Sequence, residues 1–364
     1  MIKGPRKSFI SYEVPFPQSG YVNKFISKAT CWGAHSLWIL LILGEDVFFL
    51  NIFMPVYKLL EHEVSALTEV ILFNDDHKNV YSMAIGNILL RCTVEIEAIS
   101  KELYLQLGGA PEIIDKATNK PRPPFFDSEC IQLLVDTWNI DKRKIQISHS
   151  NMYFKDVIIN PLYKANKRGS SGSKWKQAYQ GFKHHRSEAM KQANVWNMIN
   201  ALGALYILNL YYADEIFWYD APLKEKRKYA TSSEIFSPFL FDATKEKKPN
   251  KTDLEEYIFI LKYTDSSYLK QQKMNYKASI GIELQMQQTV KNNPNTASVA
   301  TDNNTLFRYL SQIPSIRCDI RDVLEDIHQQ EVILNKNVDV YPEFSREEFI
   351  ASDEGRQLLE KFKL

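Results

Sequence analysis

The most regular hydrophobic pattern in the chain lies between Val80 and Leu107. Apolar side chains recur there at intervals of three or four residues, at Ile85, Ile88, Leu89, Cys92, Ile96, Ile99 and Leu103. This spacing places them on one face of an α-helix. Gly108 and Gly109 follow directly, as is common at a helix C-terminus. We therefore predict one long amphipathic helix, whose polar face carries Arg91 and Glu95 four residues apart.

A second stretch, Val195 to Tyr212, is apolar on nearly every side. It is interrupted by three asparagines, Asn197, Asn200 and Asn209. A helix that is apolar all round belongs in a protein core or in a membrane. The amides make it a poor membrane span, and the earlier apolar run Leu37–Leu43 is far shorter than the ~20 residues that a span needs. We predict a central core helix and no contact with a membrane.

Weaker patterns complete the predicted architecture. Helical spacing extends over Asn23–Leu43, over Asp127–Asn139 and over Val47–Phe73, where Pro55 interrupts it. Trp175–Tyr212 is predicted to form one helix, or two helices with a break near Gly181. A last helix begins at the capping box of Ser345. Strand-like composition marks Tyr257–Tyr263 and Ala278–Gln285. The sequence thus predicts a mainly α protein, with a helical bundle over residues 1–215 and a smaller C-terminal part of mixed α/β structure over residues 216–364.

Composition narrows the possible functions. A formal net charge of +1 argues against a surface that is basic throughout, so any nucleic-acid surface must be local. The four cysteines form no C-x-x-C pair, which favours a reducing, cytoplasmic compartment over a disulfide framework or a zinc ribbon. Nucleotide-binding glycine loops, H-E-x-x-H and G-x-S-x-G are all missing, and the seven histidines lack metal-ligand spacing. We therefore expect no metal and no cofactor.

One segment departs from this neutral balance. Between Lys164 and Lys191 the chain has eight lysines and arginines and a single acid, Glu188. Cations that neutralise phosphates, interleaved with aromatic rings that stack on bases, are typical of RNA-binding surfaces. We predict RNA contacts from Lys174, Trp175, Lys176, Tyr179, Lys183 and His185. The alternative is a solvated loop that leads into a helix.

The centre of this segment is Lys183-His184-His185-Arg186, which we place at the polar end of the buried helix. If that helix restarts after Gly181, the four residues lie at its positive end, where an anion is favoured. If the helix is continuous from Trp175, only the clustering of charge remains. His184 has Glu188 four residues later as an orienting partner, whereas His185 shares a side with Phe182 and is expected to pack.

Two stretches together resemble the HEPN superfamily of helical-bundle proteins. They are Asn87–Tyr104 (NILLRCTVEIEAISKELY) and Trp175–Tyr212, which begins WKQAYQGFKHHR. The family's active motif is an arginine followed by four to six residues and a histidine. Here Tyr179 stands five positions before His184, and Arg186 follows it. The one literal match, Arg143 to His149, lies in a stretch with strand or loop character.

The resemblance implies a metal-independent endoribonuclease of a prokaryotic defence or toxin system. In that mechanism a histidine takes the proton from an RNA 2′-OH, which attacks the adjacent phosphate, while an arginine stabilises the phosphorane. The family implies His184 as acid and base, Arg186 as the phosphate clamp, Glu95 or Arg91 as the orienting partner, and a homodimer that joins two motifs.

Two other classes of function stay open from the sequence. A non-catalytic HEPN-like module would use the same surface to bind RNA, a nucleotide or a partner protein, and the missing upstream arginine favours it. A purely structural helical protein would simply pack the aromatic side chains. The C-terminal region offers a possible surface for a protein partner.

Overall fold

A computed structural model describes residues 41–43, 46–48, 51–115, 117–213, 217–220, 232–244, 254–292, 329–336 and 341–362. Contacts divide the chain into two compact units, Met1–Leu50 and Asn51–Leu364. In the first unit, strands β1 (Leu41–Leu43) and β2 (Asp46–Phe48) form an antiparallel pair. The prediction of a helix up to Leu43 is therefore wrong at its end, and the rest of that stretch lies outside the described residues.

The second unit is built mainly from helices. They are α2 (Phe53–Leu67), α3 (Met83–Gln106), the π-helix η1 (Phe126–Ile131), α4 (Gln132–Trp138), η2 (Ile140–Lys142), η3 (Gly169–Ser171), α5 (Lys174–His184), α6 (Arg186–Ala189), η4 (Met190–Gln192), α7 (Val195–Ala213), α9 (Asp265–Asn292), α12 (Arg346–Ala351) and α13 (Asp353–Phe362). Pro55 is tolerated in α2 because it falls in the first turn, where its missing N–H has no helical partner.

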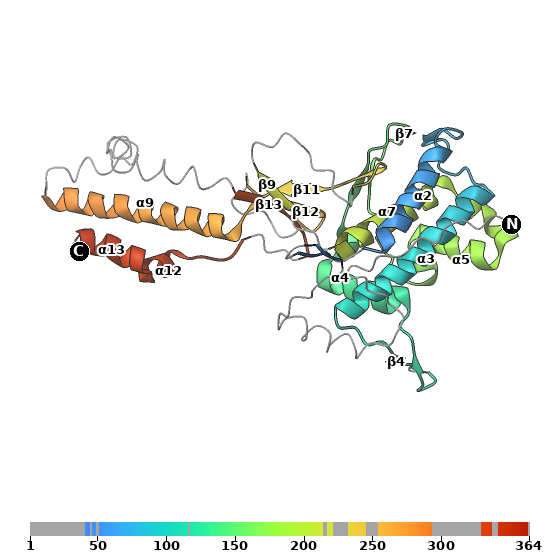
Figure 1. The fold of residues 1–364 in the computed structure, drawn as a ribbon, viewed down its shortest axis with the longest axis horizontal. Coiled ribbons are helices and arrows are strands. Elements are labelled where there is room, and N and C mark those ends of the chain that lie inside the picture. Colours follow the sequence, from blue (N-terminus) through green and yellow to red (C-terminus); the bar gives the residue numbers. More distant parts are fainter. Residues whose placement is uncertain are drawn as a thin grey trace, which may run out of the picture. The chain divides into compact units, whose positions relative to one another are not determined.

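Helix α7 is the centre of the bundle, as its sequence predicts. Every residue from Ala201 to Tyr211 is buried, and α2, α3 and α5 pack against α7 (Figure 1). Helix α3 begins at the N-cap Ser82, whose hydroxyl accepts a hydrogen bond from the Ile85 backbone N–H at 3.2 Å. Gly86 lets α5 approach α3 closely, because a Cβ at that position would lie 2.4 Å from Cζ of Phe182.

Short strands join the bundle to later parts of the chain. A three-stranded antiparallel sheet has the order β10 (Phe236–Pro238), β6 (Ile145–Ile147) and β8 (Ile158–Ile159). The four-stranded sheet has the order β11 (Leu240–Asp242), β12 (Phe259–Tyr263), β13 (Gln329–Leu334) and β9 (Phe217–Asp220), with β11 and β12 parallel. Two-stranded pairs are formed by β3 (Phe73–Asn74) with β7 (Met152–Tyr153) and by β4 (Ile113–Ile114) with β5 (Pro121–Arg122).

A buried carboxylate anchors the segment that leads into β10. Glu61 of α2 accepts hydrogen bonds from the Tyr57 hydroxyl at 2.8 Å, from Lys58 Nζ at 2.8 Å and from the Glu234 backbone N–H at 2.9 Å. The Ser233 hydroxyl donates to the same carboxylate. Burial alone would raise the pKa of Glu61, but the hydrogen bonds from Lys58, Ser233 and Tyr57 outweigh it and hold the pKa below its ordinary value. The carboxylate is therefore ionised and structural.

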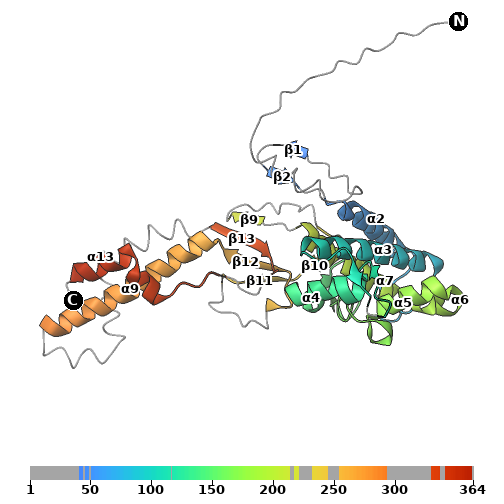
Figure 2. The ribbon, with the colours of Figure 1, turned by 90° about the horizontal axis from the view of Figure 1, so that it is seen from below.

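The C-terminal part combines the four-stranded sheet with a helical hairpin. Helix α9 packs along α12 and α13 through Ile280, Leu284 and Phe349 (Figure 2). The predicted strand over Ala278–Gln285 is wrong, since these residues belong to α9, whereas the predicted strand at Tyr257–Tyr263 is confirmed as β12. The capping box at Ser345 is present with both of its hydrogen bonds. The prediction of a mainly α fold with a smaller mixed α/β C-terminal part is confirmed.

Residues on both sides of the predicted boundary near 215 share structure, because β10 pairs with β6 of the bundle. The boundary itself stays a prediction. Among the described helices, none combines the length and the apolar character that crossing a bilayer requires.

Candidate functional site

The motif Lys183-His184-His185-Arg186 lies at the C-terminal end of α5. Helix α5 runs unbroken from Lys174 through Gly181 to His184, and the backbone of His185 (φ −134°, ψ 56°) ends it. Helix α6 and the 3₁₀ turn η4 then separate the motif from α7, which begins at Val195. The predicted placement at the positive end of the buried helix is therefore wrong. At a C-terminus the dipole favours cations, so it provides no anion site there.

Gly181 does not break the helix. Its missing side chain leaves room for Ala189 and Gln192, which pack closely against it. A Cβ at Gly181 would lie 2.8 Å from Cβ of Ala189 and 3.2 Å from Oε1 of Gln192. The glycine thus lets the chain fold back over α5 through α6 and η4. This reversal leaves Lys183, His184, His185 and Arg186 all exposed. The expectation that His185 packs against the core is wrong for the same reason.

Three residues predicted to contact RNA are buried in the core. Trp175 is 2% exposed and donates its indole N–H to the Pro161 carbonyl at 2.8 Å. Tyr179 is also 2% exposed, and its hydroxyl accepts a hydrogen bond from Lys183 Nζ at 3.2 Å. Lys176 is 4% exposed. The aromatic side chains of α5 therefore pack against the bundle and cannot stack on RNA bases.

The predicted partners of His184 on α3 do not contact it through a hydrogen bond or an ion pair in the described part of the chain. Arg91 forms an ion pair with Glu63 of α2, with Nη1 2.7 Å from both carboxylate oxygens. Glu95 is partly buried, which raises its pKa, while Arg91 partly offsets the rise. Among the described residues, neither side chain forms a hydrogen bond or ion pair with His184 or Arg186. The described structure shows no polar contact that joins Arg91 or Glu95 to His184 or Arg186.

The literal match to the family motif is structural. Arg143 is completely buried and donates to the backbone carbonyls of Trp138, Leu254, Glu255 and Tyr257 at 2.6 to 3.1 Å. These contacts fasten the chain before β12 to the end of α4. Arg143 is therefore not free to bind a phosphate.

His149, at the other end of that match, also has its nitrogens engaged. Its Nδ1 accepts from the Asn151 backbone N–H at 3.2 Å, so Nε2 must carry the proton and donate to Oγ of Ser65 at 3.0 Å. A histidine in this tautomer cannot take the proton from Ser65. The pair is not a nucleophile with its base.

Exposed cations nevertheless remain in and on both sides of α5 along the chain. Of the eight lysines and arginines between residues 164 and 191, all except Lys176 are exposed, and the set comprises Lys164, Lys167, Arg168, Lys174, Lys183, Arg186 and Lys191. We call these seven residues the α5 basic surface. Of the residues predicted to contact RNA, Lys174, Lys183 and His185 remain available to a ligand.

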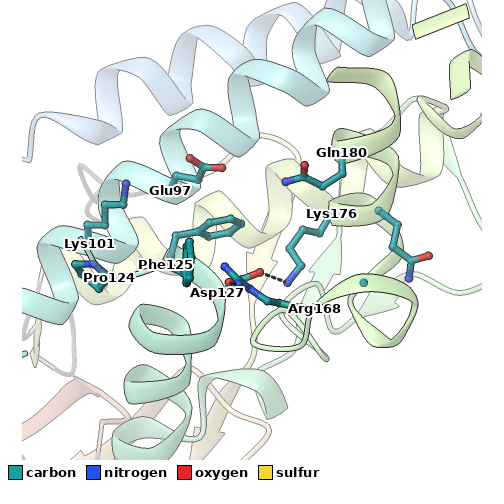
Figure 3. A pocket seen from close by; sticks show the side chains of 11 residues that line it. Glu97, Lys101, Pro124, Phe125, Asp127, Arg168, Lys176 and Gln180 are labelled. Carbon is teal, nitrogen blue, oxygen red and sulfur yellow. Dashed lines mark hydrogen bonds and ion pairs between the residues drawn. The ribbon is translucent and has the colours of Figure 1, made fainter. Parts of the chain in front are cut away.

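A pocket of about 580 Å³ opens beside this surface. It lies between α3, the start of η1 and α5, and Figure 3 shows Glu97 and Lys101 on one side with Lys176 and Gln180 opposite. Asp127 and Lys176 form a buried ion pair with Oδ2 and Nζ 3.1 Å apart. Burial lowers the pKa of Lys176, and Asp127 offsets only part of that effect.

The ammonium group of Lys176 is fully engaged. Besides Asp127, it donates to the carbonyls of Ala165 and Lys167. Three acceptors use its three protons, so Lys176 is a structural cation and not a nucleophile. Burial would raise the pKa of Asp127, but Arg168, the Ser128 backbone N–H and Lys176 hold it below its ordinary value.

Sequence reasoning missed this cluster. The helix predicted from Asp127 begins one residue earlier, as η1 with the N-cap Phe125, and the Asp127 side chain turns toward Arg168 and Lys176. A usable indication was present in α5, where Lys176 falls on the same face as Trp175 and Tyr179. A lysine on a buried face requires an anion nearby, although the pattern does not say which one.

Comparison with family models, with curated proteins and with solved structures finds no match to this chain. The HEPN resemblance therefore stays a prediction that rests on the two stretches quoted above.

Proposed function

We propose that this protein binds single-stranded RNA through the α5 basic surface without cleaving it. The observation that supports this proposal is the exposure of seven cations within 28 residues of a chain whose net charge is only +1. Such a local concentration of exposed cations neutralises a phosphate backbone and releases its counterions. Because the aromatic rings of α5 are buried, binding relies on charge and shows little preference for sequence.

The HEPN-like endoribonuclease is the competing proposal. His184 and Arg186 are exposed two residues apart at a helix end, where the same motif of a second copy could meet them in a homodimer. Within one chain, however, Arg91 is engaged by Glu63, and Glu95 forms no hydrogen bond or ion pair with His184 in the described part of the chain. A non-catalytic module fits these contacts better. In either case we place the protein in the cytoplasm, as part of a prokaryotic defence or toxin system, as the resemblance implies.

The test of RNA binding is a salt titration with a labelled single-stranded RNA. The variant Lys174→Gln/Lys183→Gln/Arg186→Gln removes three cations of the surface, while Lys120→Gln/Lys277→Gln/Lys361→Gln removes three exposed lysines elsewhere. Each lost phosphate contact reduces the slope of log K against log salt by about 0.7, so we expect the first variant to lose about 2 and the control to keep the wild-type slope. Equal slopes for both variants would refute the proposal.

Incubation with RNA in EDTA separates binding from cleavage. We expect intact RNA. Cleavage that disappears in His184→Ala/Arg186→Ala would instead support the endoribonuclease, and light scattering of the pure protein would show whether it forms the homodimer which that mechanism needs. Affinity purification with the full chain tests whether a protein partner binds, as predicted for the C-terminal region.

A further inference from the structure

Arg168 stands at the mouth of the pocket in a geometry suited to receive an anion. Its Nε donates to Oδ1 of Asp127 at 2.9 Å, and its guanidinium carbon lies 3.7 Å from the centre of the Phe125 ring. These two contacts hold the guanidinium group in one orientation. Its side chain is still 50% exposed, and its two Nη atoms have no hydrogen-bond partner in the described part of the chain.

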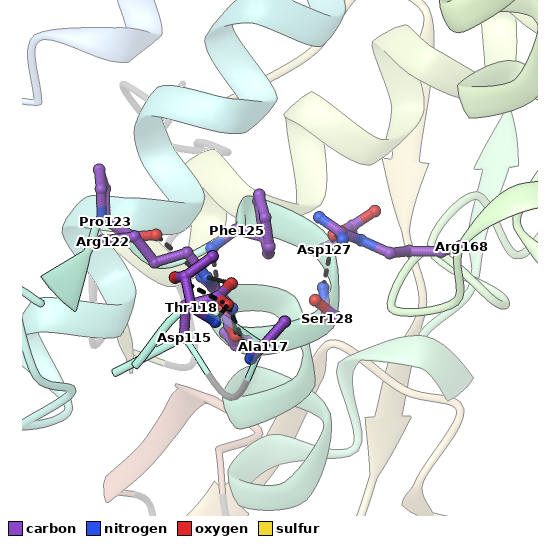
Figure 4. Close-up of polar contacts among 10 residues, drawn as sticks. Asp115, Ala117, Thr118, Arg122, Pro123, Phe125, Asp127, Ser128 and Arg168 are labelled. Atoms are coloured by element: carbon purple, nitrogen blue, oxygen red, sulfur yellow. Dashed lines mark hydrogen bonds and ion pairs between the residues drawn. The ribbon is translucent and has the colours of Figure 1, made fainter. Parts of the chain in front are cut away.

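Arg122, on the same aromatic ring, shows the contrast. Its guanidinium carbon lies 3.9 Å from the ring centre, and Figure 4 shows Phe125 between the two arginines. Each of the three nitrogens of Arg122 is engaged, because Asp115, Glu129 and the Pro123 carbonyl accept from them. Arg122 therefore fixes the ring in place, and Arg168 keeps donors for a ligand.

The charges that line the pocket favour a compact anion. Three cations, Lys101, Arg168 and Lys176, face two carboxylates, Glu97 and Asp127. Both oxygens of Asp127 are engaged by Arg168 and Lys176, so this carboxylate is already neutralised. Lys101 is exposed on the α3 side of the pocket, across from the α5 residues (Figure 3). An anion between Lys101 and Arg168 would meet donors from both sides.

The shape of the pocket limits what can carry this anion. Its inner end is closed by the buried Asp127–Lys176 pair, so a nucleic-acid strand cannot run through it. The volume of about 580 Å³ exceeds that of a single nucleotide. The amide of Gln180 is exposed on the wall, and Oε1 of Gln177 is left to accept because its Nε2 donates to the carbonyls of Ser170 and Gly172. Amides of this kind can hydrogen-bond to the edge of a base.

We propose that the pocket binds the phosphomonoester of a terminal nucleotide, at the end of an RNA strand held by the α5 basic surface. A guanidinium group with two free Nη atoms matches the oxygens of a phosphate, and a monoester carries more charge than the diesters inside the strand. Arg168 belongs to both the pocket and the basic surface, so the strand and its end can be held at the same time. This inference rests on the proposed function for the RNA, while the pocket itself can be tested without RNA.

The experiment compares one oligonucleotide with a 5′-phosphate, a 3′-phosphate or hydroxyl ends. We expect one of the phosphorylated forms to bind at least about tenfold more tightly than the hydroxyl form, the effect of one additional charge-assisted hydrogen bond. Arg168→Gln should abolish this preference. The matched control Lys167→Gln removes the same charge one residue away and should weaken all three forms equally. Lys101→Gln, an exposed substitution, should reduce the preference without a risk to folding.

Calorimetry with AMP and with inorganic phosphate completes the test. If AMP binds to the wild type but not to Arg168→Gln, the proposed phosphate site in the pocket is supported. If inorganic phosphate binds with the same affinity as AMP, the pocket recognises the phosphate group alone. If all three oligonucleotides bind equally and still depend on the α5 basic surface, the inference fails and the proposed function stands. If no RNA binds, the proposed function fails. AMP binding then shows by itself whether the pocket binds a phosphomonoester.

Discussion

Replacing Asp127 by asparagine removes the carboxylate that faces the buried ammonium group of Lys176. The substitution keeps the shape of the side chain and an oxygen for the Ser128 backbone N–H, so the main change is the loss of charge. The side chains of Lys176 and Asp127 are 5% and 9% exposed. A buried ion pair that loses one partner costs about 3–5 kcal/mol, because the other charge remains without compensation. The second partner, Arg168, is half-exposed and adds less than about 1 kcal/mol.

This cost corresponds to a fall in Tm on the order of 10 °C, measured by circular dichroism at pH 7. The pH dependence is a second readout. Burial already lowers the pKa of Lys176 in the folded protein, and without Asp127 the pKa falls further. The unfolded chain then binds more protons than the folded one, so the stability of Asp127→Asn rises with pH and its deficit narrows between pH 7 and 10.

Asp127→Asn/Lys176→Met serves as the control for this explanation. Methionine fills a similar volume without a charge, so the double variant should recover at least half of the lost stability. A loss below about 1 kcal/mol for Asp127→Asn would mean that the pair behaves as a surface ion pair. A double variant no more stable than the single one would show that charge is not the cause. Either result would refute the reasoning.

Three further substitutions test other parts of the structure. Gly86→Ala should cost about 1–3 kcal/mol through the collision of its Cβ with the Phe182 ring, and Phe182→Leu in the same chain should relieve part of that cost in thermal unfolding. Arg143→Lys replaces a guanidinium group that donates to four carbonyls by a single ammonium group. We expect the free energy of unfolding to fall by about 1.5–3 kcal/mol and RNA binding to stay unchanged. Weaker RNA binding at equal stability would contradict a structural role. The pKa of Glu61 is lowered in the folded protein, so its contribution to stability is present above the ordinary carboxyl pKa. That contribution is lost as the pH falls through the lower pKa of the folded state. The urea midpoint measured between pH 3 and 7 should therefore depend less on pH in Glu61→Gln than in the wild type.

Local patterns predicted those elements whose stability is decided by their own residues. The apolar spacing of α3, the apolar run of α7 and the capping box at Ser345 each confine the chain without help from distant segments. The strand predicted over Ala278–Gln285 failed because its alternating content covers only eight residues. The helix α9 that contains it is held through Ile280 and Leu284 against Phe349, more than 60 residues later.

The candidate site likewise has features that the local sequence predicts and features that only packing against distant segments decides. That a basic segment lies between residues 164 and 191 is plain from the sequence. Which of its side chains are exposed is not, because Trp175, Lys176 and Tyr179 become buried only when α5 packs against the bundle. The sequence also suggested the wrong end of the wrong helix for His184, because a glycine can break a helix or admit a neighbour, and only packing selects between the two.

By itself, the sequence determined a mainly helical chain with a central apolar helix and one concentrated run of positive charge. The tertiary structure decided that the motif Lys183–Arg186 lies at the end of α5 and not at the start of the apolar helix α7, and that Asp127, Phe125, Arg168 and Lys176 meet around a pocket. The physical reason is the distance along the chain over which each interaction acts. Hydrophobic periodicity and capping act within a few residues, whereas a buried charge obtains its partner from whichever segment folds beside it, here 49 residues away along the chain.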